Sequence, residues 1–163
     1  MSIIRLEELA GILAPGQRLL GLDLGEKTIG LALSDTMLTV ATPLTTLKRG
    51  KFTADAKRIT SLIAEHRIGA IIVGLPLNMD GSAGPSAQSA QAFARNFTSA
   101  GACPVVLVDE RLSTAAVTRT LLEADASRRR RHAVVDKMAA AYILQGALDR
   151  IGNLRRFSRP ENS

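Results

Sequence analysis

Two nearly continuous apolar runs separated by a short turn are the clearest pattern in the chain. Apolar residues fill most of positions 19–24 and 29–33, and the Gly25-Glu26-Lys27-Thr28 segment between them has the composition of a turn. A third run covers residues 38–47, with an interruption or bend expected at Pro43. The pattern predicts three strands joined by short turns, which form an antiparallel meander.

After this meander the pattern changes to helices alternating with strands. Two short, wholly apolar runs at residues 70–73 and 104–108 are typical of strands covered on both faces, as in a parallel sheet. Helices are expected over Thr53 to His66, Pro85 to Ala100, Ser113 or Thr114 to about Glu123, and Val134 to Ile151. The sequence therefore predicts an α/β fold. Its mixed five-stranded sheet combines the antiparallel three-strand meander with two parallel strands and has helices on both faces.

Length and composition indicate a single domain. The chain has 163 residues, of which 46% are hydrophobic, and this is enough for one buried core. We expect that core at about residues 18–151, after an N-terminal extension at residues 1–17 that contains a short helical turn. Residues 152–163 are rich in arginine and are expected to form a basic, flexible tail.

Asp23 is the exception in the first apolar run, because it places a carboxylate inside a predicted strand. A buried carboxylate without a partner is costly, so such a residue usually faces a cation, an arginine or a set of hydrogen-bond donors. Gly21 and Gly25 lie two residues to either side and share its face of the strand, which leaves room beside the carboxylate. A metal ion with a phosphate group would fit there. The alternative is that Asp23 only caps the turn.

Further acidic residues are expected close to Asp23. Asp109-Glu110 follows the last predicted strand, and Asp136 lies one turn into the last predicted helix, where interaction with the helix dipole is the structural alternative. Sites generally form at the carboxyl ends of the strands in such sheets. Convergent carboxylates without a cysteine or histidine cluster suit Mg²⁺ or Mn²⁺, and two such ions about 4 Å apart can activate water at a phosphodiester.

The charge of the chain points to an anionic partner. The formal net charge is +6 and the isoelectric point is about 10.2. Nucleic acid is the usual partner of such a protein, although a basic protein can also be merely soluble. Aromatic residues make up only 3% of the chain, which argues against a site built on stacking of bases against aromatic side chains.

Cysteine content and the N-terminal residues bear on the compartment. Cys103 is the one cysteine in the sequence, so no disulfide or cysteine-based zinc site can form within one chain, and a reducing compartment is expected. The first residues include Glu7 and Glu8 and lack the apolar core of a signal peptide. No stretch approaches the roughly 20 apolar residues of a membrane span. These features predict a cytoplasmic protein with no membrane partner.

Several polar residues are candidates for contact with a nucleic acid. Lys27 and Arg111 could hold a phosphate, and solvated surface charge is the alternative for both. Asn78 and Asp80 lie in a loop that either faces the site or only forms a turn. Four consecutive arginines could bind phosphates through counterion release or form a solvated polar segment, and these are Arg128, Arg129, Arg130 and Arg131.

Four motifs occur in the chain in a specific order and spacing. They are Gly21-x-Asp23-x-Gly25-x-Lys27-x-x-Gly30-x-Ala32-x-Ser34-Asp35, Gly74-Leu75-Pro76-Leu77-Asn78-Met79-Asp80-Gly81, Asp109-Glu110-Arg111-Leu112-Ser113-Thr114 and Val135-Asp136-Lys137-x-Ala139-Ala140. Over about residues 19–149 the chain thereby resembles the YqgF family, also called RuvX. Thr28 stands where this family often has arginine, and Ser113 where it commonly has threonine.

The resemblance implies an RNase H-like fold with a metal-dependent nuclease centre. Matched residue by residue, Asp23, Glu110 and Asp136 stand where the family has its acidic residues. They would be both the catalytic residues and the ligands of Mg²⁺ or Mn²⁺. Members of the family are described as pre-16S rRNA nucleases or Holliday junction resolvases. The resemblance therefore favours cleavage in 5′-end processing of pre-16S rRNA during ribosome biogenesis, and beside such a centre we favour backbone contact for the arginine run.

Other functions remain open at this stage. Four-way DNA in recombination and repair is the alternative substrate, and a junction resolvase would need a symmetric homodimer, whereas an rRNA nuclease could act as a monomer. A non-catalytic RNA-binding ribosome assembly factor is a further alternative. An actin-like or sugar-kinase-like nucleotide binder has a similar Asp-x-Gly hairpin but needs two domains, and 163 residues leave room for one.

Overall fold

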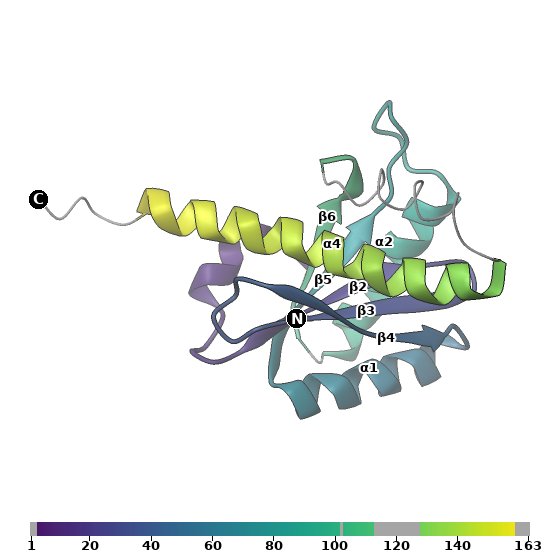
Figure 1. Cartoon of the computed structure of the whole chain (residues 1–163), viewed down its shortest axis with the longest axis horizontal. Helices are drawn as coiled ribbons and strands as arrows, with labels where there is room; N and C mark the ends of the chain where they lie inside the picture. Colours follow the sequence, from purple (N-terminus) through teal and green to yellow (C-terminus); the bar gives the residue numbers. More distant parts are fainter. Residues whose placement is uncertain (1–2, 102, 113–127, 159–163) are drawn as a thin grey trace, which may run out of the picture.

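The centre of the fold is a mixed sheet, shown in Figure 1 for the computed structural model of the chain. The structure describes residues 3–101, 103–112 and 128–158, with only the backbone described at residues 112, 128–136 and 157–158. In this described part the sheet has six strands in the order β1-β6-β5-β2-β3-β4. They are β1 (Ile3–Ile4), β2 (Arg18–Leu24), β3 (Thr28–Ser34), β4 (Ala41–Lys48), β5 (Ile68–Leu75) and β6 (Val105–Asp109).

The strand directions agree with the predicted topology. β2, β3 and β4 form the antiparallel meander, while β5 pairs in parallel with both β2 and β6. The described helices are α1 (Phe52–His66), α2 (Pro85–Ala100) and α4 (Arg128–Ser158), with the short 3₁₀-helices η1 (Leu6–Gly11) and η2 (Glu110–Leu112). The helix predicted to run from Ser113 or Thr114 to about Glu123 lies outside the described residues.

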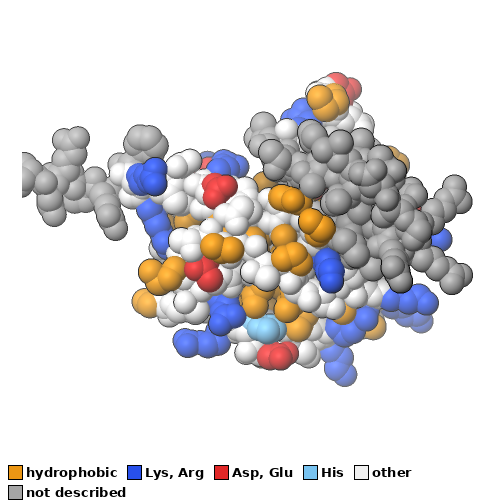
Figure 2. Space-filling model, viewed as in Figure 1, with side chains coloured by type: hydrophobic (Ala, Val, Ile, Leu, Met, Phe, Trp, Pro, Cys, Tyr) orange, Lys and Arg blue, Asp and Glu red, His pale blue; other side chains and the backbone are white. Residues whose placement is uncertain are grey.

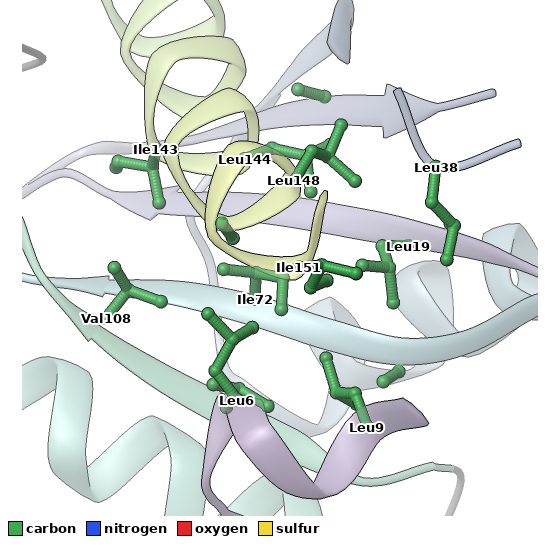
Figure 3. Packing of buried hydrophobic residues seen from close by; sticks show 14 of the residues in the cluster. Leu6, Leu9, Leu19, Leu38, Ile72, Val108, Ile143, Leu144, Leu148 and Ile151 are labelled. Atoms are coloured by element: carbon green, nitrogen blue, oxygen red, sulfur yellow. The ribbon is translucent and has the colours of Figure 1, made fainter. Parts of the chain in front are cut away.

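Helices cover both faces of the sheet, as predicted, and each face has its own core. On one face Leu19 and Ile72 pack with Leu144 and Leu148 of α4. Figure 3 shows these side chains together with those of η1, which close one side of this core. On the other face Leu20 and Ile71 belong to a core formed with α1 and α2. Neighbouring residues of β2 and β5 thus point to opposite cores, because successive side chains of a strand alternate. This explains why their sequences are almost wholly apolar.

The prediction of five strands and of an N-terminal extension outside the core is wrong. Ile3 and Ile4 form a sixth strand that pairs in parallel with Val105 and Val106. Leu6 and Leu9 of η1 are buried and belong to the same core as α4. A strand of two residues is too short to show a period-2 pattern, so its existence depends on the partner strand rather than on local sequence.

The end of the chain is more ordered than predicted. α4 starts at Arg128 instead of about Val134, and it continues without interruption to Ser158 instead of ending at Ile151. The predicted flexible tail is therefore helical as far as Ser158, while residues 159–163 lie outside the described part. Arginines 155 and 156 in the last turn favour this helix, because cationic side chains interact well with the negative end of the helix dipole.

None of the described helices could cross a membrane.

α4 lies directly on the sheet because two strand positions lack a side chain. A Cβ atom at Gly21 would lie 2.8 Å from Cβ of Leu144 and 3.0 Å from the carbonyl oxygen of Ala140. A Cβ atom at Gly74 would lie 2.5 Å from Cδ1 of Ile143. All three distances are shorter than van der Waals contact allows. Glycine at Gly21 therefore lets the α4 backbone approach β2, and glycine at Gly74 makes room for the Ile143 side chain over β5.

We predict that Gly21→Ala lowers the stability of the protein. The new methyl group would meet the α4 backbone at Ala140, so the helix has to shift away from the sheet, and overpacking of this kind costs about 1–3 kcal/mol. Urea denaturation followed by circular dichroism would measure the change in the free energy of unfolding.

Gly152→Ala is the matched control for this variant. Gly152 also belongs to the described structure of α4, but a Cβ atom there would meet nothing within 4 Å. Alanine should stabilise the helix at this position by roughly 0.5–1 kcal/mol. Equal stabilities for the two variants would contradict the close packing of α4 on β2.

Candidate functional site

Two acidic side chains are buried at one edge of the sheet. Asp23 lies at the end of β2 with 4% of its surface exposed, and Glu110 follows β6 directly with 5% exposed. Because β2, β5 and β6 run in parallel, their carboxyl ends meet at the same edge. Asp23 and Glu110 therefore lie at the carboxyl ends of strands, as predicted.

Gly74 of β5 is the point at which these two acids approach each other. The register pairs Leu22 with Val73, so Asp23 and Gly74 are the next residues along neighbouring strands, on the face covered by α4. A Cβ atom at Gly74 would lie 2.5 Å from Oε1 of Glu110, so this carboxylate occupies the space above the glycine. The carboxylate of Glu110 therefore lies over β5, the strand that pairs with the Asp23 strand β2.

The backbone of Asp136 lies in α4, the helix that covers this edge. It precedes Ala140 by four residues and Ile143 by seven, so it has the same helical register as the two residues that approach Gly21 and Gly74. The side chain of Asp136 lies outside the described part. Among the described residues no three His, Cys, Asp or Glu side chains are grouped as metal ligands.

Arg111 contacts protein groups on two sides. Its Nε lies 3.1 and 3.2 Å from the two carboxylate oxygens of Asp109, and its Nη2 donates to the same carboxylate at 2.8 Å. Its Nη1 donates to the carbonyl oxygen of Met79 at 3.2 Å. The hydrogen bond from Arg111 lowers the pKa of Asp109, and this carboxylate in turn raises the pKa of Arg111. Arg111 thus joins the end of β6 to the loop after β5, and its predicted contact with a phosphate stays a prediction.

The loop between β5 and α2 is held together by its own polar side chains. The Asn78 amide donates to Oγ of Ser82 at 3.0 Å. The Asp80 carboxylate accepts from the Ser82 hydroxyl at 2.6 Å and from its backbone N–H at 2.9 Å, and this hydroxyl is the main cause of the lowered pKa of Asp80. These contacts support the turn-forming alternative for Asn78 and Asp80. The loop projects from the body of the protein in Figure 1.

Arg49 lies beside this edge and was not predicted from the sequence. Its Nη1 donates to the carbonyl oxygen of Gly25 at 2.7 Å, and its Nη2 donates to Oγ of Ser89 at 2.8 Å. The Arg49 backbone N–H also donates to the carbonyl oxygen of Lys27, an exposed residue of the β2–β3 turn. The signal in the sequence was the density of positive charge in Lys48-Arg49-Gly50-Lys51.

An open cleft of about 430 Å³ lies beside Arg49, at the same end of β2 as Asp23. Its lining combines the β2–β3 turn with the first turns of α2, and consists of Leu24, Gly25, Glu26, Arg49, Pro85, Ser86 and Ser89. The predicted phosphate-binding residue Lys27 belongs to the same turn. The backbone of the arginine run at residues 128–131 forms the first turn of α4, and its side chains lie outside the described part.

Comparison with known proteins identifies a family and close relatives. The family model described as RuvX, Holliday junction resolvase, matches residues 17–150. A relative from Roseobacter denitrificans is 59% identical over 155 residues, which cover 92% of this chain and 95% of the relative. One from Beijerinckia indica is 56% identical over 150 residues, covering 92% and 91%. Both relatives carry the name "Putative pre-16S rRNA nuclease".

Solved structures confirm the predicted RNase H-like fold. The structure of Thermus thermophilus RuvC matches with a TM-score of 0.51 at 14% identity, covering 83% of this chain and 97% of that one. RuvC from T. thermophilus in complex with a Holliday junction substrate matches with a TM-score of 0.50 at 14% identity, covering 83% and 96%.

We predict that Arg111→Met loosens the loop between β5 and α2. The variant loses the hydrogen bond to the carbonyl oxygen of Met79, and charge-assisted bonds of this kind contribute enough to change local opening about tenfold. Hydrogen exchange read by mass spectrometry should show faster exchange of the Asn78 and Gly81 amides, which are bonded within the loop.

Arg150→Met serves as the comparison for this variant. Arg150 pairs with Glu7 at 3.5 Å, and both side chains are half-exposed. Its loss should leave exchange in the loop unchanged. Unaltered exchange at Asn78 and Gly81 in Arg111→Met would show that Arg111 does not hold the loop.

Proposed function

Because this chain belongs to the RuvX family of Holliday junction resolvases, we propose that it is a metal-dependent endonuclease that hydrolyses phosphodiester bonds at the edge of the sheet where Asp23 and Glu110 meet. The observation that carries this proposal is the pair of buried carboxylates at the carboxyl ends of β2 and β6, on either side of β5. Burial of two like charges close together is unfavourable unless a cation or other partners compensate for it. Their retention in the core is typical of a site rather than of packing.

The residues at this edge fit a hard divalent cation. Carboxylate oxygens are the ligands that Mg²⁺ and Mn²⁺ prefer, and Asp23, Glu110 and Asp136 would hold one or two such ions. A bound ion would lower the pKa of a water molecule bound to it and would stabilise the negative charge at the phosphodiester. Because Gly74 has no side chain, the Glu110 carboxylate can lie directly above it. The same glycine and Gly21 keep α4, which carries Asp136, against the sheet.

Hydrolysis of the substrate would follow the chemistry of such centres. Water attacks phosphorus in line, the bond to the 3′-oxygen breaks, and this oxygen leaves with a proton, so that the products are a 5′-phosphate and a 3′-hydroxyl. The contribution of the chain is to hold the carboxylates in fixed positions, since both lie in the core rather than on a mobile surface. Lys27, Arg111 and the arginines 128–131 are proposed contacts to the phosphates of the nucleic acid.

Precursor 16S rRNA, cut in 5′-end processing, is the proposed substrate. The support is the name "Putative pre-16S rRNA nuclease", which is shared by relatives that are 50–59% identical to this chain. A four-way DNA junction is the second candidate, favoured by the description of the family that matches residues 17–150. Processing of precursor rRNA would place the protein in the cytoplasm. Paired cuts in a junction would require a homodimer, whereas cleavage of rRNA needs only a monomer.

We predict that Asp23→Asn abolishes cleavage while the protein stays folded. The change removes one negative charge from the proposed metal site with almost no change in volume, and the loss of a metal ligand should reduce the cleavage rate by at least about a hundredfold. Labelled pre-16S rRNA and a four-way DNA junction would be incubated side by side with Mn²⁺ or with chelator.

Asp149→Asn is the control for the loss of one acidic charge. Asp149 is exposed on α4 and contacts Gln145, on a surface apart from the two buried acids. This variant should cut at the wild-type rate.

If the wild-type protein binds one of the substrates but cuts neither, the nuclease proposal is overturned and the assembly-factor function replaces it.

Metal binding can be tested without any substrate. We predict that Mn²⁺ raises the melting temperature of the wild-type protein, because a ligand that binds only the folded state at a hundred times its Kd adds about 2.7 kcal/mol. Asp23→Asn and Glu110→Gln should show little of this shift. Equal shifts in the wild type and both variants would place the bound metal elsewhere.

A further inference from the structure

Met79 is the most exposed large apolar side chain in the described part of the chain, with 90% of its surface accessible. It lies in the loop between β5 and α2. Figure 2 shows hydrophobic, acidic and basic side chains gathered at the protruding end of the molecule. A single exposed apolar residue is ordinary on a protein surface. What distinguishes Met79 is the structure that carries it.

The loop that carries Met79 has a fixed conformation. The Asn78 N–H donates to the carbonyl oxygen of Ser82 at 2.9 Å, and the Gly81 N–H donates to the carbonyl oxygen of Asn78 at 2.8 Å. Arg111 donates to the carbonyl oxygen of Met79 itself at 3.2 Å. The backbone on both sides of Met79 is thus fixed, so the exposure of its side chain is a property of the fold.

The position of the loop relates Met79 to the proposed cleavage site. Arg111, which holds the Met79 carbonyl oxygen, comes directly after the buried acid Glu110. The loop also starts at the end of β5, one residue beyond Gly74, above which the Glu110 carboxylate lies. A strand with its phosphate at the acids would therefore bring its neighbouring nucleotides next to this loop.

Nucleic-acid bases offer apolar faces that need a partner when they are unpaired. Aromatic side chains usually supply this partner. Among the described side chains the phenylalanines belong to the core, since Phe93 and Phe97 are buried and Phe52 packs edge-on against Phe93. Within the described side chains, Tyr142 is also packed against the core of α4. Methionine has a polarizable thioether, and it is among the apolar residues that proteins insert between bases.

We propose that this loop is a rigid wedge that places Met79 against the face of an unpaired base beside the scissile phosphate. This inference rests on the proposed nuclease function and adds a structural requirement to the substrate, namely an unpaired or unstacked nucleotide next to the cut. Arg111 is a positioning residue in this arrangement, because it acts on the base through the loop rather than through contact with it.

The test uses Met79→Ser and the conservative variant Met79→Leu, both in the Asp23→Asn background so that no substrate is cut. The probes are a pre-16S rRNA hairpin and a four-way DNA junction that carry 2-aminopurine at each unpaired position or junction position in turn. The parent protein should change the fluorescence at one such position. Met79→Ser should remove this change and weaken binding by about fivefold, less than loss of an aromatic stacking partner would, while Met79→Leu retains both.

Salt dependence separates a base contact from a phosphate contact. Met79 neutralises no phosphate, so Met79→Ser should weaken binding without changing the slope of log K against log salt concentration. Met37→Ser is the matched control, because Met37 is 71% exposed but lies in the β3–β4 turn, at the opposite end of β3 from Asp23. It should bind and respond like the parent.

The outcomes for the wedge and for the nuclease are distinguishable. Equal affinity and equal fluorescence change in Met79→Ser and Met37→Ser would overturn the wedge, whether or not the wild-type protein cuts RNA or DNA. A changed salt slope in Met79→Ser would overturn it as well. Failure of the nuclease proposal is read separately, from the absence of cleavage by the wild-type protein with Mn²⁺.

Discussion

The close packing of α4 against β2 and β5 is the constraint on which the rest of the molecule depends. Because Gly21 has no side chain, the α4 backbone at Ala140 and the Leu144 side chain can lie against β2, and Gly74 makes room for Ile143 on β5. Gly21 lies two residues before the buried acid Asp23 on β2, and Gly74 lies beside Asp23 on β5. The packing of α4 on these glycines therefore closes a core and also brings the helix that carries Asp136 to the edge where the strands end.

Residues with local signals were predicted well. α2 begins and ends where expected, because Pro85 suits the first turn and Gly101, with a φ of 78°, adopts the left-handed conformation that ends a helix. Asp23 and Glu110 were placed correctly at strand ends because a carboxylate at the end of an apolar run is unusual, and their role stays a prediction. β1 could not be predicted, since two residues become a strand only through β6. The contact of Arg111 with Met79 joins residues 32 positions apart, and no local pattern records it.

Charge is distributed unevenly between the core and the surface of this edge. The acids Asp23 and Glu110 are buried, whereas Lys27 is exposed and Arg111 lies at the surface. Such an arrangement attracts a polyanion from a distance and presents the carboxylates only at close range, where a cation can screen them. Arg49 has a different role, since its hydrogen bonds to Gly25 and Ser89 hold the β2–β3 turn against α2 beside this edge.

The pairing of β1 with β6, and the packing of η1 with α4, have a consequence for synthesis of the protein. Leu6 and Leu9 share a core with Leu148 and Ile151, which leave the ribosome much later in synthesis. That core can close only after α4 has been released. The opposite core, built mainly from residues 20–105, has most of its partners earlier. Long-range contacts form slowly, so a nascent chain passes through a stage in which one face of its sheet is covered and the other still waits for α4.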